Sequence, residues 1–321
     1  MKVKPVYCCF GVLYLLQLVW FSEPARGDTF AYVTHEKSND VWVINPNTDE
    51  VAAKVNVGDR PRGIVISPDR SRVYIANGNS NDISVIDAAT WKVVDTIEAG
   101  IDPEGIDLSL DGSRLYVVNE NAGEIRIFLT GSKTLVAIIT AGIEPETVVL
   151  SPDGAIAMIP NETSHDVTVI DARDGTVLAA VPVGENPRGV AFMPDGDTAY
   201  VSNERTNTVS VIDVATLKVT KTIKMGERPV GISFLPDGSR AYVAHGRSND
   251  VWVIDTSSNA VVSKIPIEGK RVWWTALTPG GEKLYATAGR SNKVAVIETS
   301  TNKVIKMIEV GERPWGVAIS H

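Results

Sequence analysis

Apolar and polar residues alternate along most of the chain, in short runs that recur at a fixed spacing. In the copy that spans residues 58–99, the runs fall at 63–67, 72–77, 82–87 and 92–99. Alternation with a period of two over runs of this length is typical of β-strands. The breaks between them hold residues that favour tight turns, such as Ser67-Pro68-Asp69 and Asn77-Gly78-Asn79. Each copy is therefore predicted to form a four-stranded antiparallel meander.

A glycine opens each copy and fixes the length of the repeat. Successive copies are separated by 42, 42, 42, 42, 43 and 42 residues, and the glycines are Gly58, Gly100, Gly142, Gly184, Gly226, Gly269 and Gly311. A period of about 40 to 45 residues with four strands is that of one β-propeller blade. The sequence thus predicts an all-β fold.

The two ends of the chain complement each other. Residues 30–57 supply the second, third and fourth strands of a copy, and the missing first strand lies at residues 311–320. Pairing the segment 311–320 with the strand at 30–34 completes a blade and removes a bare sheet edge. Six whole copies and one shared copy predict a seven-bladed β-propeller, with residues 28–321 as one domain.

The first 27 residues follow a different pattern. Lys2 and Lys4 precede an apolar run over residues 6–21, and small residues stand at Ala25 and Gly27. This order is typical of a signal peptide that is cleaved after residue 27. The apolar run is short for a membrane span, which needs about 20 residues. We therefore expect an exported protein of the periplasm, with secretion or attachment to the envelope as the alternative.

Cysteine usage and charge narrow the possible functions. Cys8 and Cys9 are the only cysteines of the sequence, and both lie in the signal segment. The mature chain would therefore have no disulfide, cysteine-bound zinc or thiol nucleophile. Removal of residues 1–27 takes away three Lys or Arg residues and one Glu, which changes the net charge from −8 to about −10. This charge argues against a general nucleic-acid surface.

The second strand of most copies, for example Val73-Tyr74-Ile75-Ala76-Asn77, resembles the YVTN-type β-propeller repeat. The phrase Met193-Pro194-Asp195-Gly196 resembles it as well, and the similarity covers residues 30–320. The chain looks most like the propeller proteins associated with alcohol catabolism dependent on pyrroloquinoline quinone (PQQ). The resemblance implies a partner such as a periplasmic quinoprotein dehydrogenase or its cytochrome. No cofactor of the chain's own is predicted, and PQQ would be reached only through the partner enzyme.

Function is expected where the copies differ, on loops at one mouth of the central channel. The loop Gly-x-x-Pro-x-Gly leads into the first strand, and the loop after the second strand lies at the same mouth. Three adjacent blades are predicted to gather basic and aromatic residues there, namely His35, Arg228, His245, Arg271, Trp273, Trp274, Arg313 and Trp315. The opposite side of the mouth is predicted to be acidic, with Asp102, Glu104, Glu144 and Glu146. Arginine can hold an anionic group, and tryptophan offers stacking contact.

No motif for covalent, nucleotide or metalloprotease chemistry occurs in the sequence, so no catalytic residue and no metal site is predicted. The leading hypothesis is a non-catalytic accessory protein that binds a partner or a small anionic or aromatic ligand. One alternative is an enzyme of the lactonase-like or dehydrogenase-subunit type. It would use His35 or His245 as general base, and Glu104 and Glu146 as acid or metal ligands. A structural protein of the cell envelope is the second alternative.

Overall fold

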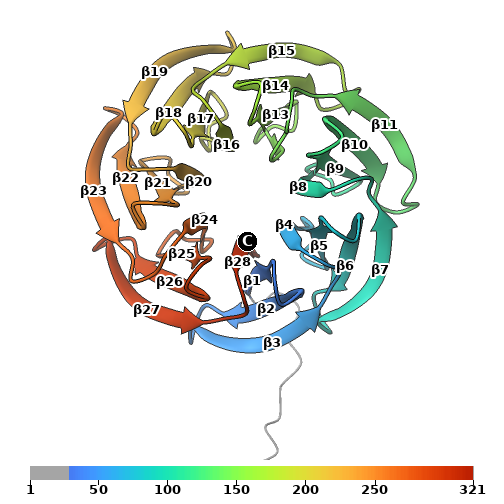
Figure 1. Cartoon of the computed structure of the whole chain (residues 1–321), viewed down its shortest axis with the longest axis horizontal. Coiled ribbons are helices and arrows are strands. Elements are labelled where there is room, and N and C mark those ends of the chain that lie inside the picture. The colour runs from blue at the N-terminus through green and yellow to red at the C-terminus, as the bar shows by residue number, and fades with distance from the viewer. Residues whose placement is uncertain (1–28, 321) are drawn as a thin grey trace, which may run out of the picture.

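The computed structural model describes residues 29–320 and shows seven β-sheets arranged in a ring (Figure 1). Each sheet is a blade of four antiparallel strands, and residues 29–320 contain no helix. It follows that no helix of this part of the chain is long and apolar enough to cross a membrane. The prediction of a seven-bladed β-propeller is confirmed. The predicted signal peptide at residues 1–27 lies outside the described residues.

The blades are numbered in chain order from the one that closes the ring, and each has its first strand nearest the axis. Blade 1 holds β28 (Pro314–Ile319), β1 (Ala31–His35), β2 (Asp40–Asn45) and β3 (Glu50–Asn56). Blade 2 holds β4 (Pro61–Ile66), β5 (Arg72–Asn77), β6 (Asp82–Asp87) and β7 (Lys92–Glu98). Blade 3 holds β8 (Pro103–Leu108), β9 (Arg114–Asn119), β10 (Glu124–Leu129) and β11 (Leu135–Thr140). Blade 4 holds β12 (Val149–Leu150), β13 (Ile156–Asn161), β14 (Asp166–Asp171) and β15 (Val177–Pro182).

The remaining blades follow the same order. Blade 5 holds β16 (Pro187–Phe192), β17 (Thr198–Asn203), β18 (Thr208–Asp213) and β19 (Lys218–Lys224). Blade 6 holds β20 (Pro229–Phe234), β21 (Arg240–His245), β22 (Asp250–Asp255) and β23 (Ala260–Pro266). Blade 7 holds β24 (Val272–Leu277), β25 (Lys283–Ala288), β26 (Lys293–Glu298) and β27 (Lys303–Glu309).

The ring closes through the two ends of the described chain, as the sequence predicts. Strand β28 pairs antiparallel with β1, and Ala31 stands opposite Ile319. Just beyond this pair, the backbone N–H of Phe30 donates a hydrogen bond to Ser320 Oγ over 2.9 Å. Figure 1 shows the red β28 on the axial side of the blue β1. The closing blade therefore has the same strand order as the other six.

The core lies between adjacent blades. Second strands are almost wholly buried, whereas the fourth strands on the rim are mostly exposed. A typical cluster joins Tyr74 and Ala76 of blade 2 to Leu115 and Val117 of blade 3. Burial on both faces requires apolar side chains on both sides of a strand, which explains why the second strands are the most apolar segments of each copy.

The seven first strands converge on the axis, and small residues make the approach possible. A Cβ atom added at Gly231 of β20 would lie 2.7 Å from the carbonyl oxygen of Trp273 on the next blade, too close for any side chain. Two blades depart from glycine at this place, with Thr147 in blade 4 and Trp274 in blade 7. In blade 4 the regular first strand is shortened to β12.

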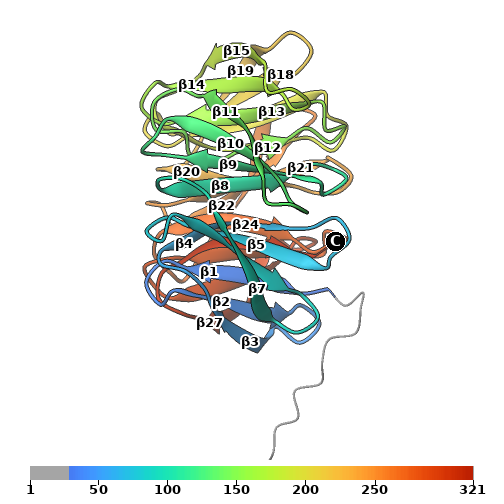
Figure 2. The same ribbon diagram turned by 90° about the vertical axis from the view of Figure 1, so that its right-hand side faces the viewer.

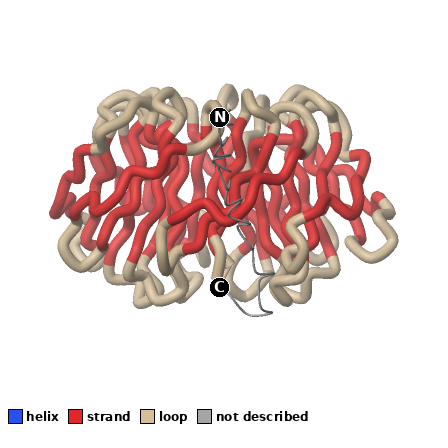
Figure 3. The backbone as a smooth tube through the Cα atoms, turned by 90° about the horizontal axis from the view of Figure 1, so that it is seen from below, coloured by secondary structure: helices blue, strands red, loops and turns tan. Residues whose placement is uncertain are grey.

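The strands cross the middle of the ring and the loops lie on its two faces (Figures 2 and 3). On one face lie the loops that precede the first strands and those that join second to third strands. We call this the mouth face. The other connections lie on the opposite face. The residues predicted to carry function lie in the loops of the mouth face or in the strand ends next to them.

Tyrosine hydroxyls tie neighbouring blades together, which gives a first prediction. The Tyr285 hydroxyl of blade 7 donates a hydrogen bond to the Asp49 carboxylate of blade 1. Replacement Tyr285→Phe removes this bond and is expected to reduce the free energy of unfolding by about 1 to 3 kcal/mol, measured by urea denaturation. Tyr74→Phe is the matched control, because the Tyr74 hydroxyl has no hydrogen-bond partner among residues 29–320. Equal losses in the two variants would contradict this role.

Candidate functional site

The loop before each first strand has an unusual backbone that fixes the direction of its side chains. The residue before the proline position has a positive φ in all seven blades, from 53° to 61°, and these residues are Arg60, Asp102, Glu144, Asn186, Arg228, Arg271 and Arg313. Side chains of the preceding blade accept a hydrogen bond from the backbone N–H of six of them, all except Glu144. For example, the backbone N–H of Arg271 donates to Asn249 Oδ1 over 2.9 Å. Left-handed non-glycine residues are uncommon and persist where surrounding contacts hold them.

A backbone hydrogen bond joins this loop to the one after the second strand. In blade 3 the N–H of Glu120 donates to the carbonyl of Asp102 over 3.1 Å, and in blade 7 the N–H of Gly289 donates to that of Arg271 over 2.9 Å. Each blade therefore presents two neighbouring positions at the mouth. The first-strand position, just after the proline position, holds Trp315, Arg62, Glu104, Glu146, Arg188, Val230 and Trp273 in blades 1 to 7. The second-strand position, just after the second strand, holds Glu36, Gly78, Glu120, Glu162, Glu204, Gly246 and Gly289.

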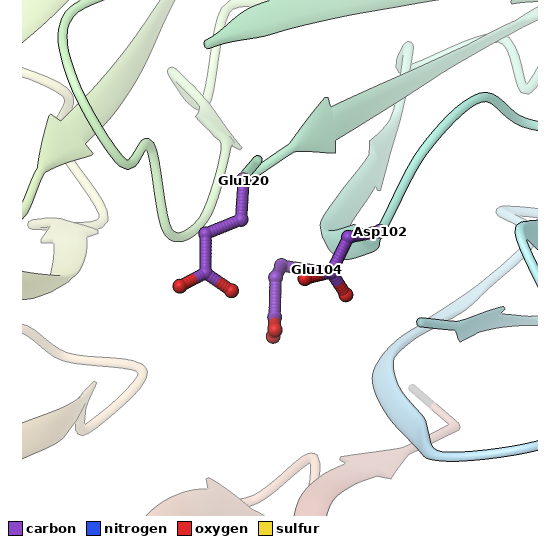
Figure 4. Close-up of side chains that lie close together, drawn as sticks. All are labelled: Asp102, Glu104 and Glu120. Atoms are coloured by element: carbon purple, nitrogen blue, oxygen red, sulfur yellow. The ribbon is translucent and has the colours of Figure 1, made fainter. Parts of the chain in front are cut away.

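Three carboxylates of blade 3 converge at the mouth (Figure 4). One oxygen from each of Asp102, Glu104 and Glu120 lies within 4.8 Å of the others, a spacing that could suit a metal ion. The Arg60 guanidinium, however, already provides positive charge next to these three carboxylates. It pairs with Asp102, lies 2.7 Å from Glu104 and lies 3.7 Å from Glu120. The cluster thus has an internal cation, and we assign no metal to it.

Two further arginines lie in carboxylate cages. Arg188 Nη1 lies 2.6 Å from Glu146, Arg188 Nη2 lies 2.5 Å from Glu162, and its Nε pairs with Glu204. Burial alone disfavours the charged guanidinium, but the three carboxylates more than offset it and raise the pKa of Arg188. Arg62 is held in the same way by Glu104 and Glu36, and its pKa is also raised. These cations are fully compensated from within the protein.

Adjacent blades also contain two pairs of facing carboxyl groups. Burial, and then the hydrogen bond and charge of Glu104, raise the pKa of Glu120 to about 8. In blade 4 burial raises the pKa of Glu146, and a hydrogen bond with Glu162 adds to this effect against the influence of Arg188. Two carboxylates in contact cannot both ionise easily, so each pair favours one shared proton.

A cavity of about 410 Å³ over blades 5, 6 and 7 has the opposite character. Its lining contains five arginines and one carboxylate, and consists of Arg188, Glu204, Arg228, Gly246, Arg247, Arg271, Trp273 and Arg290. The nearest ion-pair partner of Arg271 is Glu36, at 3.7 Å. Burial and the nearby cations Arg62, Arg290 and Arg188 lower the pKa of Arg271, against the effect of Glu36. Arg271 therefore lacks the carboxylates that surround Arg62 and Arg188.

The second-strand position explains this shortage. It holds glutamate in blades 1, 3, 4 and 5 and glycine in blades 2, 6 and 7, so two adjacent blades lack the glutamate only at blades 6 and 7. A Cβ atom at Gly246 would lie 2.9 Å from the Trp273 ring, and one at Gly289 would lie 3.0 Å from the carbonyl oxygen of Pro314. Glycine here both admits the tryptophan and leaves out a negative charge. We call the region of this cavity the basic sector.

The tryptophans form an apolar base for the basic sector. Trp273, Trp274 and Trp315 pack together with Val230, and Trp273 is only 6% exposed. The Arg271 guanidinium lies over the Trp273 ring, 4.2 Å from its centroid. Such stacking orients the guanidinium and leaves its edge free to donate hydrogen bonds. The predicted cluster of Arg228, Arg271 and the three tryptophans is thus brought together.

His35 and His245 lie elsewhere than expected. Both rings are completely buried at the ends of the second strands, and each pairs through Nδ1 with an aspartate, over 2.9 Å to Asp40 and 3.1 Å to Asp250. In other blades asparagine makes the equivalent contact, as Asn77 does with Asp82. The residues are therefore part of the blade's internal hydrogen-bond network. Because neither ring reaches the mouth, we leave both out of the candidate site.

The predicted residues Arg313 and Glu144 lie outside the basic sector. Arg313 lies in a separate cavity of about 400 Å³ together with Lys37, Gly289, Arg290, Asn292 and Glu312. Glu144 accepts a hydrogen bond from the Thr163 hydroxyl and is apart from the arginine cages. Sequence reasoning overlooked Arg62, Arg188 and the four glutamates of the second-strand position. A comparison of the second-strand position among the seven copies could have identified these glutamates as candidates.

Comparisons with known proteins agree on the fold. The model of the YNCE-like β-propeller family matches residues 30–321. No curated protein matches the chain. Among solved structures, a functionally unknown protein from Desulfotomaculum acetoxidans is 19% identical, with a TM-score of 0.81 over 91% of this chain and 99% of that one. The periplasmic gluconolactonase PpgL of Pseudomonas aeruginosa is 18% identical, with a TM-score of 0.77 over 92% and 99%. Hydrazine synthase of Kuenenia stuttgartiensis is 21% identical, with a TM-score of 0.74 over 79% and 87%.

The raised pKa of Glu120 predicts a pH dependence of stability. The group is protonated in the folded protein between its ordinary value of 4.5 and about 8, whereas it is ionised in the unfolded chain. Its contribution to stability is therefore fully present below pH 4.5 and is lost as the pH rises through 8. Replacement Glu120→Gln keeps a neutral side chain and should reduce the fall in urea midpoint between pH 5 and pH 8.

Glu144→Gln is the control, because Glu144 lies outside the carboxyl pairs. It should leave the fall in midpoint at its wild-type size. A Glu120→Gln variant with the same fall as the wild-type protein would show that Glu120 does not hold this proton.

Proposed function

This chain belongs to the YNCE-like β-propeller family, and we propose that it serves as a non-catalytic binding protein whose basic sector holds an anionic group. The group would belong to a small ligand or to a partner protein. The single observation that carries the proposal is the position of Arg271 among other cations with one distant carboxylate. An anion placed there would supply the missing compensation.

Within the same mouth, the caged arginines provide an internal comparison. Arg62 and Arg188 already have two and three carboxylate partners. An incoming anion gains little from them, because it would be repelled by the glutamates around them. Around Arg271 positive charge exceeds negative charge. Arg228 and Arg290 add positive charge, and Gly246 and Gly289 supply no negative charge. Anion binding is therefore expected at one side of the mouth.

The shape of the basic sector favours a planar anionic group. The Arg271 guanidinium, whose N–H donors all lie in one plane, is held over the Trp273 ring. A guanidinium fixed in this way matches the two oxygens of a carboxylate, and phosphate can be held similarly. The cavity of about 410 Å³ has room for a small molecule or for a few side chains of a partner.

We also propose that the protein is exported to the periplasm and accompanies PQQ-dependent alcohol oxidation. The pattern of residues 1–27 supports export, and the YVTN-type repeats support the association. The partner would be a quinoprotein dehydrogenase or its cytochrome. In this proposal any PQQ stays with the partner enzyme.

Lactone hydrolysis is a second candidate, favoured by one specific observation. Glu120 lies at the mouth with its pKa raised to about 8, which is the range that suits a general acid or base near neutral pH. One protein of similar fold is a periplasmic gluconolactonase. The candidate no longer includes His35 or His245 as base, since both rings are buried.

The binding proposal predicts a clear effect at Arg271. Titration of mature protein with citrate, measured by isothermal titration calorimetry, should show saturable binding that Arg271→Gln weakens at least tenfold. Arg240→Gln on the opposite face is the control and should bind like the wild-type protein. Because the charge of Arg271 is only weakly compensated, by Glu36 at 3.7 Å, its replacement should not lower the unfolding midpoint. Unchanged citrate affinity in Arg271→Gln would refute the proposed site.

The two candidate functions differ in turnover. With glucono-δ-lactone as substrate, followed by acid release in a pH-stat, the binding proposal predicts no rate above spontaneous hydrolysis. The enzyme candidate predicts a faster rate that falls at least 100-fold in Glu120→Gln, the usual size of a general acid–base contribution. Glu144→Gln is the matched control for the second outcome.

A further inference from the structure

The basic sector is the middle one of three neighbouring cavities on the mouth face, which we together call the groove. The cavity of about 410 Å³ shares Arg188, Glu204, Arg228 and Arg247 with a cavity of about 540 Å³ toward blade 5. On its other side it shares Arg290 with the cavity of about 400 Å³ that reaches blade 1. Together the three linings contain eight cations and four carboxylates. This positive arc lies on a chain whose net charge is −8.

A single repeat position gives the arc its regularity. The second residue after the second strand is a cation in four consecutive blades, as Arg205, Arg247, Arg290 and Lys37 in blades 5, 6, 7 and 1. In blades 2, 3 and 4 the same position holds Asn79, Asn121 and Thr163. We call the four cations the ladder.

The same hydrogen bond holds the backbone of every member of the ladder. The N–H of Arg205 donates to the carbonyl of Glu185 over 3.1 Å, and that of Lys37 donates to the carbonyl of Glu312 over 3.2 Å. Arg247 and Arg290 make the equivalent bonds over 3.2 and 2.9 Å. The four residues therefore occupy equivalent backbone positions on successive blades around the mouth. All four side chains are exposed, so their charges are open to a partner.

We propose that the ladder binds an extended acidic segment of a partner protein, whose carboxylates pair with successive blades. This inference rests on the proposed function, because one carboxylate of the segment would occupy the Arg271 site. It goes further by naming the ligand as a chain with several carboxylates. A single small anion uses only the middle of the groove and leaves Arg205 and Lys37 without a role.

Interleaved carboxylates favour a protein segment over a nucleic acid. Arg205 lies 3.4 Å from Glu185 and Arg247 lies 3.2 Å from Glu227, and both glutamates are more than half exposed. A phosphodiester chain has one negative charge on every nucleotide and would meet these glutamates at close range. A peptide can place serine, asparagine or lysine opposite them and aspartate or glutamate opposite the arginines. Charge complementarity of this mixed kind gives specificity and register.

The test uses labelled peptides of the alternating sequence Glu-Ser with two, four or eight glutamates, and follows binding to mature protein by fluorescence anisotropy. Affinity should rise at least tenfold from the two-glutamate to the eight-glutamate peptide at low salt. Arg205→Gln and Lys37→Gln should each weaken the eight-glutamate peptide about threefold to fivefold and leave the two-glutamate peptide unchanged. Arg271→Gln should weaken all three, and Arg240→Gln should weaken none.

The outcomes separate the two proposals. If citrate and the shortest peptide bind but affinity does not grow with length, the ladder inference is wrong and anion binding at Arg271 stands. If no probe binds, the proposed function fails together with the inference. If single-stranded oligothymidylate with eight phosphates binds more tightly than the eight-glutamate peptide, the partner is a nucleic acid and the inference is overturned.

Discussion

Convergence of seven first strands on one axis is the constraint from which the rest of this structure follows. Glycines such as Gly231 allow the close approach, and the loops that lead into these strands must then face one another across a narrow mouth. Left-handed residues before the proline position, each in the same backbone setting, fix where their side chains point. Charged residues at these positions lie close to one another. The ratio of positive to negative charge among them therefore decides what the mouth can bind.

The number of carboxylate partners for each arginine differs around the ring. Arg60, Arg62 and Arg188 lie among carboxylates, and the neighbouring carboxyl pairs retain protons because burial and like charge oppose ionisation. In blades 6 and 7 glycine takes the place of glutamate, and the cations there have few partners. A substitution needed for the packing of Trp273 thus also creates a positive sector. In this account, structure and binding follow from the same two glycines.

The fold could be predicted from the sequence because strand alternation, turn residues and the complementary ends are local features. The burial of His35 and His245 could not, because that position ends a second strand and lies inside the blade in all seven copies, whether it holds asparagine, histidine or alanine. The cages of Arg62 and Arg188 were missed for a different reason. Their meaning depends on pairs of positions on neighbouring blades, and each position taken alone looks like a solvated charge.

An anomalous diffraction map from crystals soaked in bromide tests the central claim most directly, namely that Arg271 has only one distant carboxylate partner whereas Arg62 and Arg188 have two and three close ones. We expect the strongest bromide peak at the mouth to lie beside Arg271 and Arg290, with no peak beside Arg62 or Arg188. Peaks of equal height at the caged arginines, or a mouth without bromide near Arg271, would contradict the account.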